Sequence, residues 1–210
     1  MIYDFSQVCK TYKKNFYTAD FFTDTSCPKC GAIGRFKLYG SYARYIIYFS
    51  DFKVVNTAID IKRIMCKSCK TTHAVLPGDI IAYELLSLFV FLFVLISFHI
   101  KKVPVLRMAS KLHFSFQFIY ATLNTFVVFV NSIHQFFKET SPGDTSSIST
   151  SFKVLELIKL YNPYTQFQYN YIKLNKRPCF MCKFFTGGKH PPVGIIRISS
   201  PLKGSNITIE

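Results

Sequence analysis

The sequence predicts an α+β protein in which a small antiparallel sheet is followed by a mainly helical region. Two observations lead to this fold class. Two closely spaced cysteine pairs enclose runs of β-branched and aromatic residues, and long apolar stretches with few charges follow Gly78. We therefore divide the chain into residues 1–78, 79–139 and 140–210.

The strands are expected between the cysteine pairs. From Phe36 to Tyr48 and from Lys53 to Met65, β-branched and aromatic residues partly alternate with polar ones. Such runs are typical of strands, and here they predict two or three of them. Before Ser26, aromatic residues and lysines follow no regular period, so we expect an irregular or short helical lead-in there.

Four cysteines form two pairs, each with two residues between its members. This spacing is typical of tight turns that direct two thiolates to one point. Four sulfur atoms at about 2.3 Å satisfy a tetrahedral zinc ion and leave no vacant position. We predict one structural zinc ion, held in a zinc ribbon by Cys27, Cys30, Cys66 and Cys69, with unligated buried thiols as the alternative.

Three further groups could bind metal. His73 follows the second pair closely, but four thiolates already complete the site, so we expect a structural histidine. Cys179 and Cys182 have the same spacing as the other pairs but no partner pair. They could join Cys9 or His190 around a second metal or form a redox pair, and we expect them only to fill space.

The helical region is expected to begin after Pro77-Gly78, where Asp79 could cap a helix starting at Ile80. Residues 85–100 are uncharged and almost wholly apolar. As a helix they would span about 24 Å, short of the roughly 30 Å hydrocarbon core of a bilayer, so we predict a buried helix. The alternative is a membrane-spanning hairpin formed by residues 80–100 and 112–137.

Residues 104–124 have the pattern of a helix-turn-helix unit. A first helix would bury Val105, Met108, Ala109 and Leu112, and His113 suits a turn that needs positive φ. Ser115 could cap a second helix with Phe118, Ile119 and Leu123 turned inward. The second helix contains no Lys or Arg, so a plain helical hairpin is the alternative.

The last region begins with a linker. Residues 140–147 have turn and loop composition, and a short apolar helix is expected around Phe152 to Leu160. The aromatic and lysine-rich stretch that follows has no assignment, and the region has no predicted role.

Lys and Arg outnumber Asp and Glu by 26 to 11, which favours a polyanionic partner such as DNA or anionic lipid over a merely basic surface. The excess is concentrated in residues 1–78 and 141–210. The paired cysteines and the lack of an early signal-peptide pattern predict a reducing cytoplasm. The candidate DNA contacts are Lys29, Arg35, Lys37, Arg44, Lys62, Arg63, Lys67, Lys70, Arg107, Lys111, Gln117 and Asn124.

The order of the first cysteine pair, Gly40-Ser41-Tyr42-Ala43-Arg44-Tyr45, the second pair, Thr72-His73-Ala74-Val75-Leu76-Pro77 and a helix-turn-helix-like unit resembles an uncharacterised bacterial family, domain of unknown function 6431. The resemblance covers about residues 25–125. That family is similar to the amino-terminal zinc ribbon and helix-turn-helix of insertion-sequence transposases. The resemblance implies DNA binding in a mobile-element context.

We predict no enzymatic activity. Transposases of the common type need three carboxylates around two metal ions, and after the linker only Asp144, Glu156 and Glu210 remain. The predicted function is a non-catalytic zinc-ribbon DNA-binding protein. The alternatives are a membrane-associated protein with a cytoplasmic ribbon and a protein-interaction module, and the oligomeric state has no signal.

Overall fold

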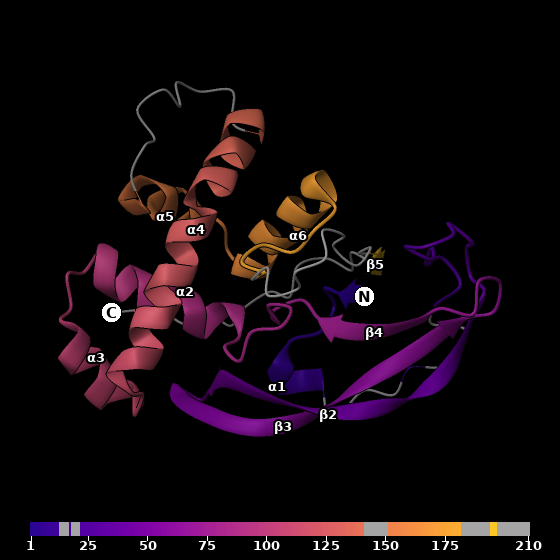
Figure 1. Cartoon of the computed structure of the whole chain (residues 1–210), viewed down its shortest axis with the longest axis horizontal. Helices are drawn as coiled ribbons and strands as arrows, with labels where there is room; N and C mark the ends of the chain where they lie inside the picture. Colours follow the sequence, from indigo (N-terminus) through magenta and orange to yellow (C-terminus); the bar gives the residue numbers. More distant parts are fainter. Residues whose placement is uncertain (13–16, 18–21, 141–150, 182–193, 197–210) are drawn as a thin grey trace.

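The computed structural model describes residues 1–12, 17, 22–140, 151–181 and 194–196, which form a mixed α+β fold (Figure 1). A curved sheet runs along one side, and most of the helices gather over one end of it. The elements are β1 (Ile2–Asp4), α1 (Cys9–Tyr12), β2 (Phe36–Ser50), β3 (Lys53–Cys66), β4 (Thr72–Pro77), α2 (Leu88–His99), α3 (Val105–Leu112), α4 (Phe116–Thr140), α5 (Ser151–Lys159), α6 (Tyr164–Asn175) and β5 (Gly194–Ile196).

The sheet has the strand order β2-β3-β4-β1-β5. β2 and β3 form a long antiparallel hairpin, paired from Phe36 opposite Cys66 to Ser50 opposite Lys53, and β4 pairs antiparallel with β3. The strands expected between the cysteine pairs are therefore confirmed. The sheet is nevertheless mixed and larger than the predicted antiparallel one, because β1 pairs in parallel with both β4 and β5.

The N-terminal lead-in is more regular than expected, because it contributes β1 and the short helix α1. Ile2 and Tyr3 are fully buried beside β4. The buried Asp4 carboxylate accepts hydrogen bonds from the Tyr17 hydroxyl at 2.8 Å and the Ser6 amide at 2.9 Å. The Tyr12 hydroxyl donates to the Val75 carbonyl of β4 at 2.6 Å. These bonds fix the lead-in to the sheet.

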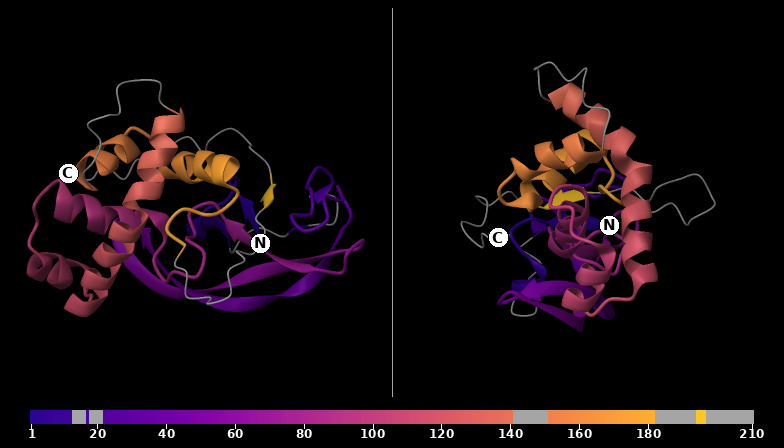
Figure 2. Two further views of the ribbon diagram at one scale, coloured as in Figure 1. Left: turned by 45° about the horizontal axis from the view of Figure 1, so that its top comes forward. Right: turned by 90° about the vertical axis from the view of Figure 1, so that its left-hand side faces the viewer.

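Helix α2 lies at the centre of the helical half, against β2, α3, α4, α5 and α6 (Figure 2). Most of its side chains are buried, which explains an apolar stretch without a polar face. The predicted buried helix is confirmed, but it begins at Leu88 and not at Ile80. Residues 85–87 instead lie along β2, where the Ile47 amide donates to the Leu85 carbonyl and the Ser87 amide donates to the Ile47 carbonyl, both at 2.8 Å.

Asp79 caps a different helix from the predicted one. Its carboxylate accepts the Cys9 amide at the start of α1 at 2.9 Å, although the two residues are 70 positions apart. No helix starts at Ile80, so that prediction was wrong. Full burial raises the pKa of Asp79 to about 6, against the lowering effect of its hydrogen bonds with Cys9.

The region after the linker packs into the helical half. The helix expected around residues 152–160 is confirmed as α5, and the stretch without an assignment forms α6. The Gln168 side chain of α6 donates to the Ile80 carbonyl at 2.9 Å, and aromatic rings of α4 and α6 contact one another, as in the Phe136–Phe167 and Phe136–Tyr171 pairs. The linker residues 141–147 lie outside the described residues.

Replacing Asp79 by asparagine keeps a carbonyl oxygen for the Cys9 amide and removes the buried ionisable group. Because the carboxyl pKa is raised in the folded state, the wild-type chain loses stability as pH rises from about 4 through 6. Between pH 5 and pH 7 this loss is about 1 kcal/mol. We expect the melting temperature of Asp79→Asn, relative to wild type, to rise over that interval.

Asp24→Asn, which changes an exposed carboxylate, is the control for this comparison. If the difference in melting temperature between Asp79→Asn and wild type does not vary with pH, burial does not raise the pKa of Asp79.

Candidate metal centre

The first cysteine turn is closed by two backbone hydrogen bonds. The Gly31 amide donates to the Cys27 carbonyl at 2.8 Å, and the Cys27 amide donates to the Ala32 carbonyl at 2.9 Å. Gly31 has a φ of 75°, a conformation that glycine adopts without strain. Gly34, also at positive φ, lies so close to the Thr23 carbonyl that a Cβ atom would be 2.6 Å from its oxygen. Both glycines therefore shape this turn.

The second turn has the same bonding pattern. The Lys70 amide donates to the Cys66 carbonyl at 2.9 Å, and the Cys66 amide donates to the Thr71 carbonyl at 3.0 Å. Lys70 takes the left-handed position of Gly31, with a φ of 57°. The Lys67 amide also donates to the Arg35 carbonyl at 2.7 Å, which joins this turn to the start of β2. The two turns thus present their cysteines in equivalent ways.

The four sulfur atoms converge at one point. The Sγ atoms of Cys27 and Cys69 are 3.7 Å apart, as are those of Cys30 and Cys66, and all four lie within 4.8 Å of one another. A disulfide would need about 2.05 Å, whereas a tetrahedral ion at about 2.3 Å from each sulfur holds its ligands about 3.8 Å apart. The predicted clustering is therefore confirmed, and its geometry fits a metal site.

The ionisation of the four thiols depends on the charge that lies among them. Hydrogen bonds from the Thr71 hydroxyl and amide lower the pKa of Cys69 to about 6. The Ala32 amide lowers the pKa of Cys30, but desolvation and the neighbouring sulfur atoms outweigh it and raise that pKa to about 11. Four thiols at this distance cannot all ionise unless a positive charge lies among them.

His73 contacts the cluster without converging on its centre. It is buried on β4, its Nε2 atom is 3.4 Å from the Cys27 sulfur, and its ring packs edge-on against Phe36. Burial, together with the positive N-terminus and Lys29, lowers the pKa of His73 to about 4. A neutral imidazole protonated at Nε2 can donate a hydrogen bond to the Cys27 sulfur, a role that sequence spacing alone did not indicate.

The third cysteine pair is described only in part. Cys179 is buried among apolar side chains of the helical half, as expected for a residue that fills space. Cys182 and His190 lie outside the described residues. Cys9 is buried beside Asp79 and away from the four-sulfur cluster, which is the one group of three or more metal-binding side chains in the described part of the chain.

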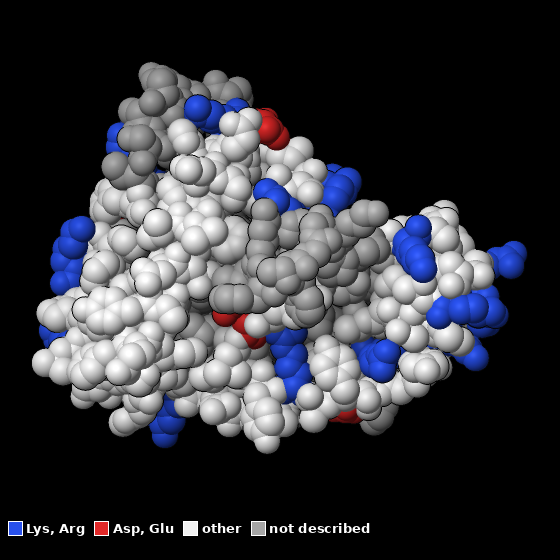
Figure 3. All heavy atoms as spheres, viewed as in Figure 1, with Lys and Arg blue, Asp and Glu red and all other residues white. Residues whose placement is uncertain are grey.

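The eight basic residues predicted as DNA contacts in and around the β2–β3 hairpin fall into two sets. Exposed side chains surround the cysteine turns and the adjoining strand ends: Lys29, Arg35, Lys37, Lys67 and Lys70. Figure 3 shows basic side chains gathered at that end of the molecule. The other three are already engaged: Arg44 donates to the Ile81 and Glu84 carbonyls, Arg63 donates to the Thr72 hydroxyl, and Lys62 pairs with Asp60.

The local structure expected at residues 104–124 is present. His113 ends α3 with a φ of 56°, and the Ser115 hydroxyl accepts the Phe118 amide at the start of α4 at 3.2 Å. Of the predicted inward residues, Met108, Ala109, Leu112, Ile119 and Leu123 are buried, whereas Val105 and Phe118 are only half-buried. α4 nevertheless continues for 25 residues, to Thr140. The predicted contacts are all exposed: Arg107, Lys111, Gln117 and Asn124.

Residues 27–97 match the model of a family described as a domain of unknown function (DUF6431). The match covers about a third of the chain, from the first cysteine into α2, so it includes the metal centre but neither α3 nor α4. No curated protein and no solved structure matches the chain. The resemblance is thus supported for the cysteine-rich region, without a function attached to it.

We expect the purified protein to carry one metal ion per chain, because four sulfur ligands complete a single site. Cys69→Ser should reduce the metal content at least tenfold, whereas Cys9→Ser, outside the cluster, should retain it. Binding of this kind contributes on the order of 10 kcal/mol to folding, so a strong chelator should unfold the ribbon. Elemental analysis and circular dichroism measure both effects.

Two ions per chain would contradict the expectation that Cys179 and Cys182 only fill space. A well-folded chain without metal, indifferent to chelators, would contradict the metal centre itself.

Proposed function

We propose that the chain is a non-catalytic zinc-ribbon protein that binds DNA mainly through phosphate contacts. The observation that carries this proposal is a cluster of four converging sulfur atoms at an exposed, basic end of the sheet (Figure 3). The cluster explains why this end is folded, and the charges around it explain which partner it would attract.

Zinc is the ion that this donor set favours. Sites of four thiolates in tetrahedral geometry are typical of structural zinc, which has no preferred geometry of its own. Because the four sulfur atoms fill the coordination sphere, no position remains for a water molecule or a substrate. A closed site of this kind favours a structural role for the metal, and we propose no enzymatic activity for the chain. The need for reduced thiolates favours a cytoplasmic location.

DNA is favoured by the sign and placement of the charges. Residues 27–50 and 61–78 contain eight basic and no acidic residues, namely Lys29, Arg35, Lys37, Arg44, Lys62, Arg63, Lys67 and Lys70. The five exposed ones around the cysteine turns are free of acidic sequence neighbours, so their field is not cancelled locally. Each contact of a Lys or Arg with a DNA phosphate releases counterions, which makes such binding strong at low salt.

The α3–α4 unit would add to these contacts. Arg107 and Lys111 could reach phosphates, and the exposed amides of Gln117 and Asn124 could bind adenine in the major groove. The exposure of all four residues on two consecutive helices supports this role. The possible transposon origin of the chain rests on the resemblance in the order of its motifs.

We expect generic duplex DNA to be bound at low salt, with the logarithm of affinity falling linearly with the logarithm of salt concentration. A ribbon variant combines Lys29→Gln, Lys37→Gln, Lys67→Gln and Lys70→Asn, where asparagine suits the left-handed position of Lys70. If all four contact phosphates, the slope should fall by about 3.6, at about 0.9 per contact. Fluorescence anisotropy measures both quantities.

A matched control combines Lys138→Gln, Lys159→Gln, Lys173→Gln and Lys176→Asn, all exposed and on the helical half. It removes the same charge and also includes a left-handed lysine, at Lys176. If the control variant loses as much affinity as the ribbon variant, the effect is due to net charge and not to the ribbon residues. If the wild-type chain does not bind DNA even at low salt, the proposal is wrong. Gln117→Ala and Asn124→Ala should change sequence preference more than overall affinity.

A membrane-associated protein with a cytoplasmic ribbon is the second candidate, because of α4. By length and composition this helix could cross a membrane, and only 33% of its apolar window is buried. The predicted two-helix hairpin is less well supported, because α2 has 12 residues, about 18 Å, and is largely enclosed by protein.

Fractionation separates the two candidates. For the DNA-binding protein we expect recovery in the supernatant after carbonate extraction, whereas a spanning α4 would keep the chain in the pellet. Binding of a protein partner that persists at high salt, with no binding of DNA, would instead favour a protein-interaction module.

A further inference from the structure

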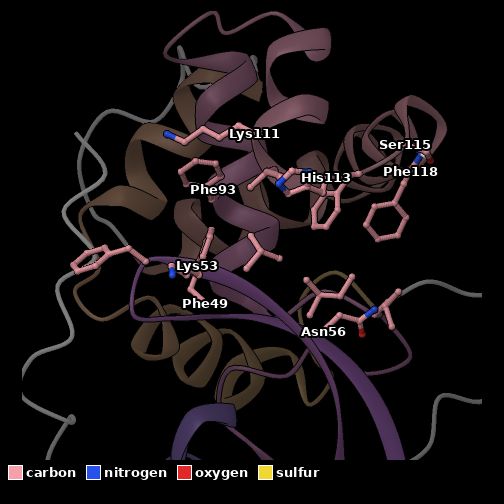
Figure 4. A pocket seen from close by; sticks show the side chains of 14 residues that line it. Phe49, Lys53, Asn56, Phe93, Lys111, His113, Ser115 and Phe118 are labelled. Atoms are coloured by element: carbon pink, nitrogen blue, oxygen red, sulfur yellow. Dashed lines mark hydrogen bonds between the residues drawn. The ribbon is translucent and has the colours of Figure 1, made fainter.

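A cavity of about 840 Å³ opens where the tip of the β2–β3 hairpin faces the junction of α3 and α4 (Figure 4). It lies at the opposite end of the hairpin from the cysteine turns. Its described lining residues are Ile47, Phe49, Phe52, Lys53, Val54, Asn56, Leu85, Phe93, Lys111, Leu112, His113, Phe114, Ser115 and Phe118. This volume is within the usual range of small-molecule sites, about 300–1,000 Å³.

The lining is mostly apolar and rich in aromatic rings. Five phenylalanines come from three different parts of the fold: Phe49 and Phe52 from the hairpin, Phe93 from α2, and Phe114 and Phe118 from the α3–α4 turn and the first turn of α4. Phe49 and Phe93 contact edge-on, with ring centroids 5.4 Å apart, as do Phe114 and Phe118 at 5.1 Å. Such walls favour an apolar ligand body.

The charged side chains of the lining are all lysines. Lys53 of the hairpin and Lys111 of α3 lie on either side of Phe93 in Figure 4, and the Lys111 ammonium is 5.9 Å from the centre of that ring. No Asp or Glu lines the described cavity, and the nearby Asp51 already pairs with Lys10 at 2.7 Å. Within the described residues, neither Lys53 nor Lys111 forms an ion pair.

Phe52 occupies a turn position that bulky residues disfavour. Asp51 and Phe52 form the two-residue tip between β2 and β3, and both have positive φ, 50° and 62°. Such turns favour Asn-Gly, and a bulky residue there is strained. The phenylalanine is also 80% exposed, so burial does not offset the strain. An exposed ring in a strained position at the rim of a cavity points to a contact made with a ligand.

We infer that this cavity binds a small amphipathic anion, an acyl chain carried against the phenylalanines with its single carboxylate between Lys53 and Lys111. The acyl chain would pack against the aromatic walls. The carboxylate would pair with the two lysines, which lack acidic partners. The site is separate from the basic end of the sheet, so it adds a ligand to the proposed function and does not depend on it.

Calorimetric titration of the full chain with monomeric dodecanoate tests this inference. We expect one molecule to bind per chain, at least tenfold more tightly than dodecyltrimethylammonium, which has the same tail and the opposite charge. Acetate, which has the head group without the tail, should not bind measurably. Equal affinity for the two dodecyl compounds would overturn the inference, because the lysines would then have no role.

Two variants assign the binding to the cavity. Lys53→Gln should weaken dodecanoate binding about tenfold, whereas Lys138→Gln, exposed on α4 and outside the cavity lining, should leave it unchanged. Phe52→Asn should also weaken it several-fold without disturbing the fold, since asparagine tolerates left-handed backbone. Lys111 is also a candidate DNA contact, so Lys53 carries the decisive comparison. Dodecanoate binding that is insensitive to both variants would overturn the site.

A second probe distinguishes a free fatty acid from a membrane lipid as the ligand. Monomeric dodecanoate and vesicles of anionic phospholipid share the head-group charge and the acyl chain. Binding to vesicles without binding to the monomer would overturn the cavity and favour a surface contact with lipid. A failure here is distinguishable from a failure of the DNA proposal, because neither Lys53 nor Phe52 is among the proposed DNA contacts.

Discussion

The convergence of four sulfur atoms from two distant turns is the constraint on which the sheet depends. Cys30 and Cys66 are 36 residues apart, yet their sulfur atoms meet at the open end of the hairpin. The second turn is joined directly to the start of β2 through Arg35, and Phe36 pairs with Cys66. An ion at this point would close the β2–β3 hairpin at the end opposite its turn. The β2–β3 strand pair would then be joined by its turn at one end and by the metal ion at the other. The free energy of metal binding would stabilise it where few of its residues are buried.

The elements that sequence reasoning located are those whose signals are local. The paired cysteines, the hairpin strands, and the sequence from Met108 through His113 to Ser115 each depend on a few neighbouring residues. The elements that it missed depend on distant partners. β1 and β5 have three residues each, too few to show a period, and Asp79 caps a helix 70 residues away. The predicted start of α2 was wrong because residues 80–87 are as apolar as a helix, whereas residues 85–87 lie along β2 and Ile80 pairs with Ser87.

The candidate sites divide in the same way. Cysteine spacing alone identified four side chains that do converge, because a tight turn fixes the direction of both thiols. Sequence could not separate Arg44, whose guanidinium holds two backbone carbonyls, from Lys70, which is exposed beside the cluster. Nor could it find the contact of His73 with the Cys27 sulfur or the cavity at the hairpin tip, since both arise where segments distant in sequence meet.

The hairpin holds the cysteine turns and the aromatic cavity at opposite ends. At about 3.3 Å per residue, β2 is roughly 45 Å long, with the cysteine turns at one end and the aromatic cavity at the other. Charges separated by more than the Debye length of about 8 Å are largely screened from each other at physiological salt. In the two proposals, the cavity lysines would therefore act on a ligand independently of the basic residues around the cysteine turns. The cysteine-turn end would attract a polyanion by its field, with α3 and α4 adding contacts, while the cavity would select a small anion by its apolar walls.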